Sequence, residues 1–299
     1  MKKWKQMMEI KQIMIPFSGR EGELAALRTA FHLAEAHRAH VEVLHISPDP
    51  YQVVFSYAPG YFFPLDYPPH EIISNLAKAY AAIRAQAKST FLRISAEMNM
   101  RISDDNVPGE SSTSFHGISN AADRMIGPAG RVADLIVFSR ALKETGAVPA
   151  QDLYCALFET GRPVLIIPEG TEAPASYDRI LIAWNGSVEA TRAVAGALPL
   201  LQKAKVCVFS GRGPGAPEFP VSSTDLVRYL KLHEIVAQAI ESPFATGDLP
   251  LTLEQAAVIQ NASLIVMGAY SHSRFREVIL GGLTDHMLRK ATLPVLMAH

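Results

Sequence analysis

Three glycines near the end of the chain stand where backbone N–H groups could hold a phosphate. The apolar run Leu264–Met267 has the composition of a buried strand, and Gly268 ends it. After a polar loop, Gly281 and Gly282 come directly before Leu283–Ala291, whose apolar residues have helical spacing. Glycine lets the backbone approach a ligand closely, and a helix N-terminus adds partial positive charge. This layout predicts a phosphate-binding loop, and a plain tight turn between strand and helix is the alternative.

A polar residue at the end of another apolar run could complete such a site. Asn185 follows the strand-like residues of the segment ILIAWNGS, and its amide could hydrogen-bond to a ribose or a base. In open parallel sheets, ligands bind outside the carboxyl ends of the strands. Asn185 and Gly268 can therefore face one crevice. Thr284 is a candidate N-cap for the helix that follows, with Asp285 in its first turn.

The elements that would position these residues occur twice. The stretches IKQIMIPFSGREGELAALRTAFHLAEAHRAHVEVLHIS and YDRILIAWNGSVEATRAVAGALPLLQKAKVCVFSG each read as strand, turn, helix and strand. Later in each copy, ADLIVFSR matches ASLIVMGA, and GRPVLIIP matches TLPVLMAH. The strands are continuous apolar runs that alternate with helices, which favours a parallel sheet covered on both faces, with about five strands per copy.

The predicted fold is therefore α/β, with two tandem doubly wound parallel-sheet domains of Rossmann-like type. We expect the domains to cover residues 1–170 and 177–299, with a seam at EGTEAPASYD, residues 169–178. The apolar strands PVLIIP and PVLMAH would be exposed edges if left alone. We expect the two copies to pack together there as a pseudo-symmetric pair.

Composition limits the classes of function. The 299 residues are 48% apolar, enough for two cores, and the net charge is −1 without a basic run, which argues against nucleic acid. No run of 18 apolar residues predicts a membrane span. The N-terminus MKKWKQMMEIKQIMIP lacks the apolar core of a signal peptide, and two cysteines without a CxxC pair indicate a reducing compartment. We expect a soluble, cytoplasmic protein.

Other segments are expected to have structural roles. The aromatic and proline-rich segment 51–67 predicts an irregular loop that covers the core or contacts a ligand or a subunit. ESSTSFH, residues 110–116, contains candidate nucleophilic serines, but no His–Asp pairing is identifiable, so a polar loop that caps the next helix is predicted. His272, His286 and His299 lack the spacing of a metal site, and no metal site is predicted.

With ILIAWNGS at the start of the second copy and VMGAYSHSRFREVILGGLT near its end, the chain resembles the universal stress protein family. Nucleotide-binding members carry glycine, two residues, glycine, nine residues, glycine, then serine or threonine. Here Gly268 takes the first place, Ser271 replaces the second glycine, Gly281 follows at the kept spacing, and Gly282 stands where the hydroxyl residue is expected. Asn185 stands where members often have an aspartate, which should weaken any help with Mg²⁺.

The resemblance implies a cytoplasmic stress-response protein, commonly dimeric, that can bind ATP or AMP. It places the nucleotide site at Asn185, Met267, Gly268, Ser271, Gly281 and Gly282. The first copy, with Ser18 and Ser139 at the matching places, is expected to serve as a structural partner, and a homodimer of the chain is possible. We predict binding of an adenine nucleotide without efficient catalysis. The alternatives are a weak ATPase, a non-nucleotide binding module, or an ATP-dependent ligase, whose Ser-Gly-Gly-x-Asp-Ser loop neither copy contains.

Overall fold

The protein is described by a computed structural model, which covers residues 9–56, 69–105, 107–119, 126–140, 148–171, 174, 176–211, 221–241, 249–269 and 282–299. Within these residues, ten strands form one sheet in the order β3-β2-β1-β4-β5-β10-β9-β6-β7-β8. The strands are β1 (Gln12–Pro16), β2 (His40–Ser47), β3 (Ser112–Ser119), β4 (Leu135–Arg140), β5 (Val164–Pro168), β6 (Arg179–Ala183), β7 (Lys205–Ser210), β8 (Ala237–Glu241), β9 (Leu264–Gly268) and β10 (Val295–Ala298).

The sheet consists of two parallel sets of five strands that meet at one antiparallel pair. The order 3-2-1-4-5 of the first set is repeated, reversed across the sheet, as 10-9-6-7-8 in the second. At the junction, Val295 of β10 pairs with Ile166 of β5, and Met297 pairs with Val164. The prediction that the strands PVLIIP and PVLMAH meet in a pseudo-symmetric pair is therefore confirmed. The domain boundaries at residues 170 and 177 stay a prediction.

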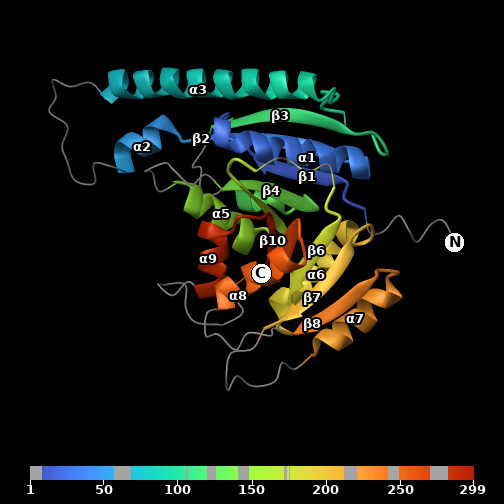
Figure 1. The fold of residues 1–299 in the computed structure, drawn as a ribbon. Coiled ribbons are helices and arrows are strands. Elements are labelled where there is room, and N and C mark those ends of the chain that lie inside the picture. The colour runs from blue at the N-terminus through green and yellow to red at the C-terminus, as the bar shows by residue number, and fades with distance from the viewer. Residues whose placement is uncertain are drawn as a thin grey trace.

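Helices cover both faces of the sheet (Figure 1). Core residues of α1, α3, α6 and α7 belong to one buried cluster, and those of α4, α5, α8 and α9 belong to the other. Among the described residues, no helix is both long and apolar enough to cross a membrane. The helices are η2 (Glu21–Glu23), α1 (Leu24–His37), α2 (Pro50–Ser56), α3 (Pro69–Glu97), α4 (Ile126–Gly130), α5 (Val148–Glu159), α6 (Val188–Leu201), α7 (Ser223–Leu232), α8 (Leu249–Ile259) and α9 (Gly282–Lys290).

The alternation of side chains along the strands explains why both faces are apolar. In β9, Leu264 and Val266 belong to the first cluster, whereas Ile265 and Met267 belong to the second. Burying one such side chain contributes about 1.5–3 kcal/mol. Both clusters contain residues from both sets of strands, so the two copies share their cores. This confirms the predicted α/β fold with a doubly wound, largely parallel sheet.

Two expectations from the sequence are wrong. Most of residues 110–116 lie in an edge strand, β3, and not in a loop that caps a helix. The strand forms because β3 pairs with β2 in register from His40–Ser112 to Ser47–Ser119, and because its buried hydroxyl groups find partners. The aromatic segment begins in a helix, α2, since proline is tolerated in a first helical turn. Residues 57–68 of that segment lie outside the described residues.

Candidate functional site

The carboxyl end of β6 leads into α6 through a turn that polar groups hold in place. Asn185 accepts a hydrogen bond from the Ser187 N–H through Oδ1, at 3.1 Å, and Gly186 between them has a positive φ of 69°. The Ser187 side chain then caps α6 by accepting from the Ala190 N–H, also at 3.1 Å. The other N–H groups of the first turn have no acceptor within the helix. The turn therefore presents an amide side chain beside the positive end of a helix.

Gly268, at the end of β9, lies against this first turn of α6. A Cβ at residue 268 would be 2.5 Å from the Ala190 nitrogen and 2.8 Å from the Glu189 carbonyl carbon. Ala183 of β6 is the register partner of Met267, which brings the ends of the two strands together. The structure thus places Asn185 and Gly268 at one edge of the sheet, as the sequence predicted. It also gives Gly268 a packing role, because any side chain would push β9 away from α6.

The other two described site residues lie differently. The side chain of Met267 is 3% exposed and belongs to the core on the face opposite α6, so only its backbone can face the crevice. Gly282 is exposed and begins α9, and a Cβ there would meet no atom of the described residues within 4 Å. Thr284 is the third residue of α9 and is buried, so the expectation that it caps the helix is wrong. Ser271 and Gly281 lie outside the described residues.

Charges on α9 follow the helix dipole. Asp285 lies in the first turn, and its Oδ1 accepts from the Arg289 Nε at 2.6 Å in the last turn. Asp285 would by itself oppose a phosphate at this helix end, and its pairing with Arg289 partly offsets that charge. Gly282 therefore offers an accessible backbone at a helix N-terminus, with a neighbouring carboxylate that is already paired.

In the first copy, the matching turn is closed by the chain's own carboxylate. Glu23 accepts from the Ser18 N–H at 2.7 Å, from the Ser18 hydroxyl at 2.7 Å and from the Gly19 N–H at 3.1 Å. These are the donors that an anionic ligand would need. At the end of β4, the Ser139 hydroxyl donates to the Gly22 carbonyl at 2.8 Å, which ties this strand end to the same turn. The first copy thus has an internal anion at this turn, whereas residues 184–187 of the second copy contain no carboxylate.

Helix α3 adds to this closure. Gly19 has φ of 87°, and a Cβ there would be 2.6 Å from the Cα of Ala87, in the middle of α3. Figure 1 shows α3 running the length of this side of the molecule, over β2 and α1. The side of the turn after β1 that faces α3 is thus closely packed, and the structural role of the first copy stays a prediction.

The two copies are joined at the same end of the sheet by a buried arginine. Arg140 ends β4, and its Nη1 donates to the Met287 carbonyl in α9 at 3.4 Å. This carbonyl lies at the C-terminal, negative end of the helix, which suits a guanidinium group. Burial lowers the pKa of Arg140, and the carboxylate of Glu254 acts in the opposite direction. Glu254 itself contacts the His286 Nε2 at 3.1 Å. The first copy thereby helps to hold α9.

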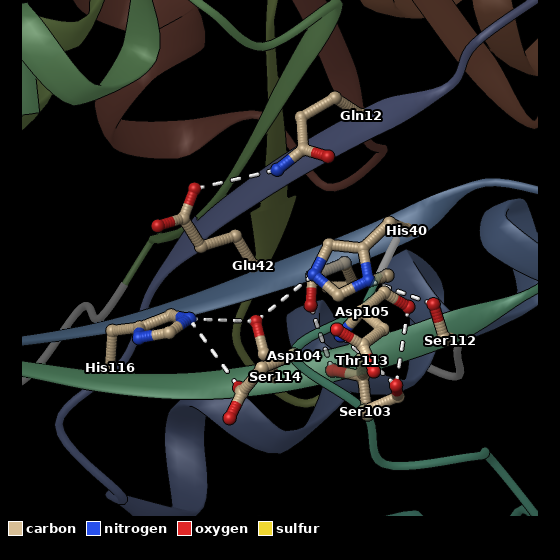
Figure 2. A network of polar contacts seen from close by, with 11 residues as sticks. Gln12, His40, Glu42, Ser103, Asp104, Asp105, Ser112, Thr113, Ser114 and His116 are labelled. Carbon is tan, nitrogen blue, oxygen red and sulfur yellow. Dashed lines mark hydrogen bonds and ion pairs between the residues drawn. The ribbon is translucent and has the colours of Figure 1, made fainter. Parts of the chain in front are cut away.

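A second polar cluster lies on β2 and β3 (Figure 2). The buried imidazole of His40 contacts the Ser112 hydroxyl through Nδ1 at 2.8 Å and the Ser114 hydroxyl through Nε2 at 3.0 Å. The Ser114 hydroxyl also contacts the His116 Nε2 at 3.0 Å, and the same nitrogen lies 3.8 Å from Asp104 Oδ1. The His–Asp pair that the sequence did not reveal therefore exists beside a serine.

This cluster does not have the geometry of a nucleophilic triad. Asp104 faces the same nitrogen of His116 that contacts Ser114, whereas a triad needs the carboxylate on the other nitrogen. Ser114 is 1% exposed, so a substrate could not reach its hydroxyl. The pKa of His40 is lowered, mainly by burial and further by the charge of His116. The cluster therefore satisfies buried polar groups at a sheet edge, and no candidate catalytic residue follows from it.

The described residues also contain no cluster of potential metal ligands. In the parts of the chain that the structure describes, no group of three or more His, Cys, Asp or Glu side chains is arranged to hold a metal ion. Sequence reasoning missed two residues that shape the turns, Ser187 and Glu23. The first could have been found, because serine before a helical run is a common N-cap. The second could not, because nothing in FSGREGE shows that Glu23 folds back onto Ser18.

Comparison with known proteins agrees with this architecture. Residues 176–299 match the model of the Universal stress protein family. A universal stress protein from Archaeoglobus fulgidus DSM 4304 has a similar structure, with a TM-score of 0.67, 14% identity, and coverage of 98% of this chain and 97% of that one. A putative universal stress protein from Pseudomonas aeruginosa UCBPP-PA14 gives a TM-score of 0.54, 16% identity, and coverage of 98% and 94%. The comparison with curated proteins gives no match.

At these identities, the solved structures show the fold alone. The family match lies in the second copy, which contains Asn185, Gly268 and Gly282. The fold match extends over both copies, including the junction between β5 and β10. Residues 176–299 thus match the universal stress protein family, and the chain has the fold of solved universal stress proteins along nearly its whole length.

Proposed function

We propose that this protein binds an adenine nucleotide, ATP or AMP, in its second copy and acts in a cytoplasmic stress response without efficient catalysis. The match of residues 176–299 to the universal stress protein family supports the stress-related role. Asn185, the backbone of Met267 and Gly268, and Gly282 are the described residues assigned to the site. Ser271 and Gly281 are assigned to it from the sequence alone.

The observation that carries this proposal is the contrast between the two matching turns. In the first copy, the donors after β1 are taken by Glu23. In the second copy, residues 184–187 between β6 and α6 contain no acidic residue and lead into a helix N-terminus, with Glu189 in the first turn of that helix. A phosphate bound there would accept from backbone N–H groups, which is a favourable arrangement at helix N-termini. The amide of Asn185 lies on the same turn and can contact the sugar or the base.

Hydrolysis has little support from the described residues. The amide of Asn185 does not titrate and cannot serve as a base. Glu189 lies in the first turn of α6 beside Gly268, and among the described residues no second acid or base is paired with it. We therefore expect ATP turnover far below the ~10 s⁻¹ that is typical of enzymes. Mg²⁺ would reach the site mainly with the nucleotide, since Asn185 supplies no carboxylate.

Thermal unfolding with and without nucleotide tests the proposal. At a hundred times the dissociation constant, a ligand adds about 2.7 kcal/mol to the free energy of unfolding. At roughly 2–4 °C per kcal/mol, the melting temperature should rise by several degrees. Gly282→Val should remove most of this shift without unfolding the protein, because a Cβ at residue 282 meets no atom of the described residues within 4 Å. Its side chain would instead occupy the approach of the phosphate.

Asn185→Asp is the matched gain-of-function variant. An aspartate keeps an oxygen that can accept from the Ser187 N–H, and it supplies the missing carboxylate. We expect the stabilisation by ATP to become larger in the presence of Mg²⁺ than in its absence. If ATP, ADP and AMP at millimolar concentration leave the melting temperature of both proteins unchanged, the nucleotide proposal is wrong. The chain would then be better described as a binding module for other ligands.

A further inference from the structure

A positively charged hollow lies at the other end of the sheet, where the strands begin. It has a volume of about 300 Å³, comparable to the smaller ligand pockets of proteins. Its walls come from the C-terminal ends of α1 and α6, one helix from each copy, and from the residues before β1. The charged and polar side chains that line it are those of Glu9, Lys11, His37, Arg38, Gln202 and Lys203. Figure 1 shows the chain entering β1 on this side, beside the end of α1.

The charges around the hollow are unequal. Lys11, Arg38 and Lys203 are cations, and Glu9 supplies a single carboxylate, which contacts the Lys11 Nζ at 2.5 Å. Lys11 also donates to the His37 carbonyl at 3.4 Å, which offsets part of the negative end of the α1 dipole. The two helix ends therefore reduce the positive potential but do not cancel it. Glu9 acts as an internal counter-ion of Lys11, and Arg38 and Lys203 form no ion pair with any of the described residues.

The pKa values of Glu9 and His37 are both affected by these charges. The pKa of Glu9 is lowered, first by its hydrogen bond with Lys11 and also by the charges of His37 and Arg38. The pKa of His37 is lowered, first by burial and next by the charge of Lys203. Lys203 from the second copy thus acts on His37 from the first, across the hollow.

The backbone at Arg38 bears on the choice of a test variant. Arg38 has φ of 53°, a left-handed conformation that favours glycine or asparagine. Just beyond the ends of α3, α7 and α8, the residues with positive φ are Asn99, Glu234 and Asn261. Asparagine therefore suits this backbone at least as well as arginine, so Arg38 can be replaced by asparagine without backbone strain.

We propose that this hollow binds a small multivalent oxyanion of the phosphate or pyrophosphate class, held between the two copies. Arg38 would contact the anion through its planar fork of N–H groups, and Lys203 would act as a point charge from the opposite wall. Gln202 adds an amide donor, and His37 can add a proton as the anion approaches. The site is separate from the nucleotide crevice, because that crevice lies at the carboxyl ends of the strands.

Calorimetric titration of the full chain with pyrophosphate, at constant ionic strength, tests this site. Lys203→Gln should weaken binding about tenfold, the order expected for one lost charge-assisted contact. Lys231→Gln is the matched control, since it removes an exposed lysine from the last turn of α7, outside the hollow. Glu9→Gln should strengthen binding, because it removes the competing internal anion.

The Arg38→Asn variant distinguishes a loss of anion binding from a loss of stability. Asparagine tolerates the left-handed backbone, so the unfolding midpoint in urea should stay the same or rise, while pyrophosphate affinity falls. Pyrophosphate should also raise the pKa of His37 in an NMR titration, where the facing charges are Glu9, Lys11, Arg38 and Lys203.

Pyrophosphate and AMP together distinguish a site for free anions from a site for the phosphate of a nucleotide. If the hollow takes free anions, Lys203→Gln should weaken pyrophosphate but leave stabilisation by AMP intact, and Gly282→Val should do the reverse. Equal affinities of the wild type, Lys203→Gln and Arg38→Asn, or an equal loss in Lys231→Gln, would show non-specific attraction only and would overturn the proposal. Loss of nucleotide stabilisation in Gly282→Val with pyrophosphate binding unchanged would leave it standing.

Discussion

Alanine at Gly268 and alanine at Gly282 should have opposite effects on stability, although both glycines belong to one sequence motif. At residue 268, a Cβ would lie 2.5 Å from the Ala190 nitrogen and 2.8 Å from the Glu189 carbonyl carbon. These are backbone atoms of α6 and cannot rotate away, so the strand and the helix must separate. At residue 282, a Cβ meets no atom of the described residues within 4 Å. Neither glycine has a positive φ, so backbone strain does not enter the comparison.

The expected magnitudes follow from these contacts. Overpacking of this kind typically costs about 1–3 kcal/mol. At roughly 2–4 °C per kcal/mol, Gly268→Ala should lower the melting temperature by several degrees. Gly282→Ala replaces glycine in the first turn of α9, where alanine is favoured by up to about 1 kcal/mol, so stability should stay the same or rise slightly.

Urea unfolding followed by far-ultraviolet circular dichroism is the assay, with the wild type measured in the same buffer without nucleotide. The two variants have the same added methyl group, so each is the control for the other. If the free energy of unfolding of Gly268→Ala lies within about 0.5 kcal/mol of that of the wild type, β9 does not pack on α6 as closely as the structure indicates. If both variants lose the same stability, the glycines differ less than the structure indicates.

Three further predictions concern the sheet. Burial lowers the pKa of His40, so the free energy of unfolding should have its full value above about pH 6.5 and fall as the pH drops below it. Urea titrations at pH 7.5 and pH 5.5 measure this difference, and His40→Gln should make it smaller. Ser114→Ala should cost about 1–3 kcal/mol by leaving the His40 Nε2 without its partner, and an unchanged urea midpoint would contradict the contacts in Figure 2. The amides of β10 should exchange with solvent as slowly as those of β6, because β10 lies inside the sheet between β5 and β9, and exchange as fast as in the edge strand β8 would contradict the junction.

Much of the fold could be predicted because the strands are continuous apolar runs. Leu264–Met267 and its counterpart in ADLIVFSR are buried on both faces, and such runs are readable without knowing their neighbours. The repeat then indicated that the two copies pack together, since two equal edges can cover each other, whereas the antiparallel sense of the β5–β10 pairing is visible only in the structure. β3 was missed because Ser112, Thr113 and Ser114 have the composition of a loop. Their burial depends on His40 and the Val41 carbonyl, more than 70 positions earlier in the chain.

The candidate site was predicted less completely, for a physical reason. A glycine in a motif can serve a ligand, a turn or a close packing contact, and the residue type is the same in each case. Gly268 lies where α6 leaves no room for a side chain, and this follows from the position of Ala190. In the same way, the Ser-Gly turn of the first copy looks open in the sequence, but Glu23 returns to fill it. Such contacts come from the path of the backbone and not from local composition.

The most direct test of nucleotide binding in the second copy is a map of amide chemical shifts of the isotope-labelled chain as AMP is added. If AMP binds in the second copy, the largest shift changes should occur at the ends of β6 and β9 and at the start of α9, in Asn185, Ser187, Gly268 and Gly282. The amides near Ser18 and Gly19 should not move, because Glu23 already occupies their donors. Shifts confined to the first copy or to the hollow beside Lys203, or none at saturating AMP, would contradict nucleotide binding in the second copy.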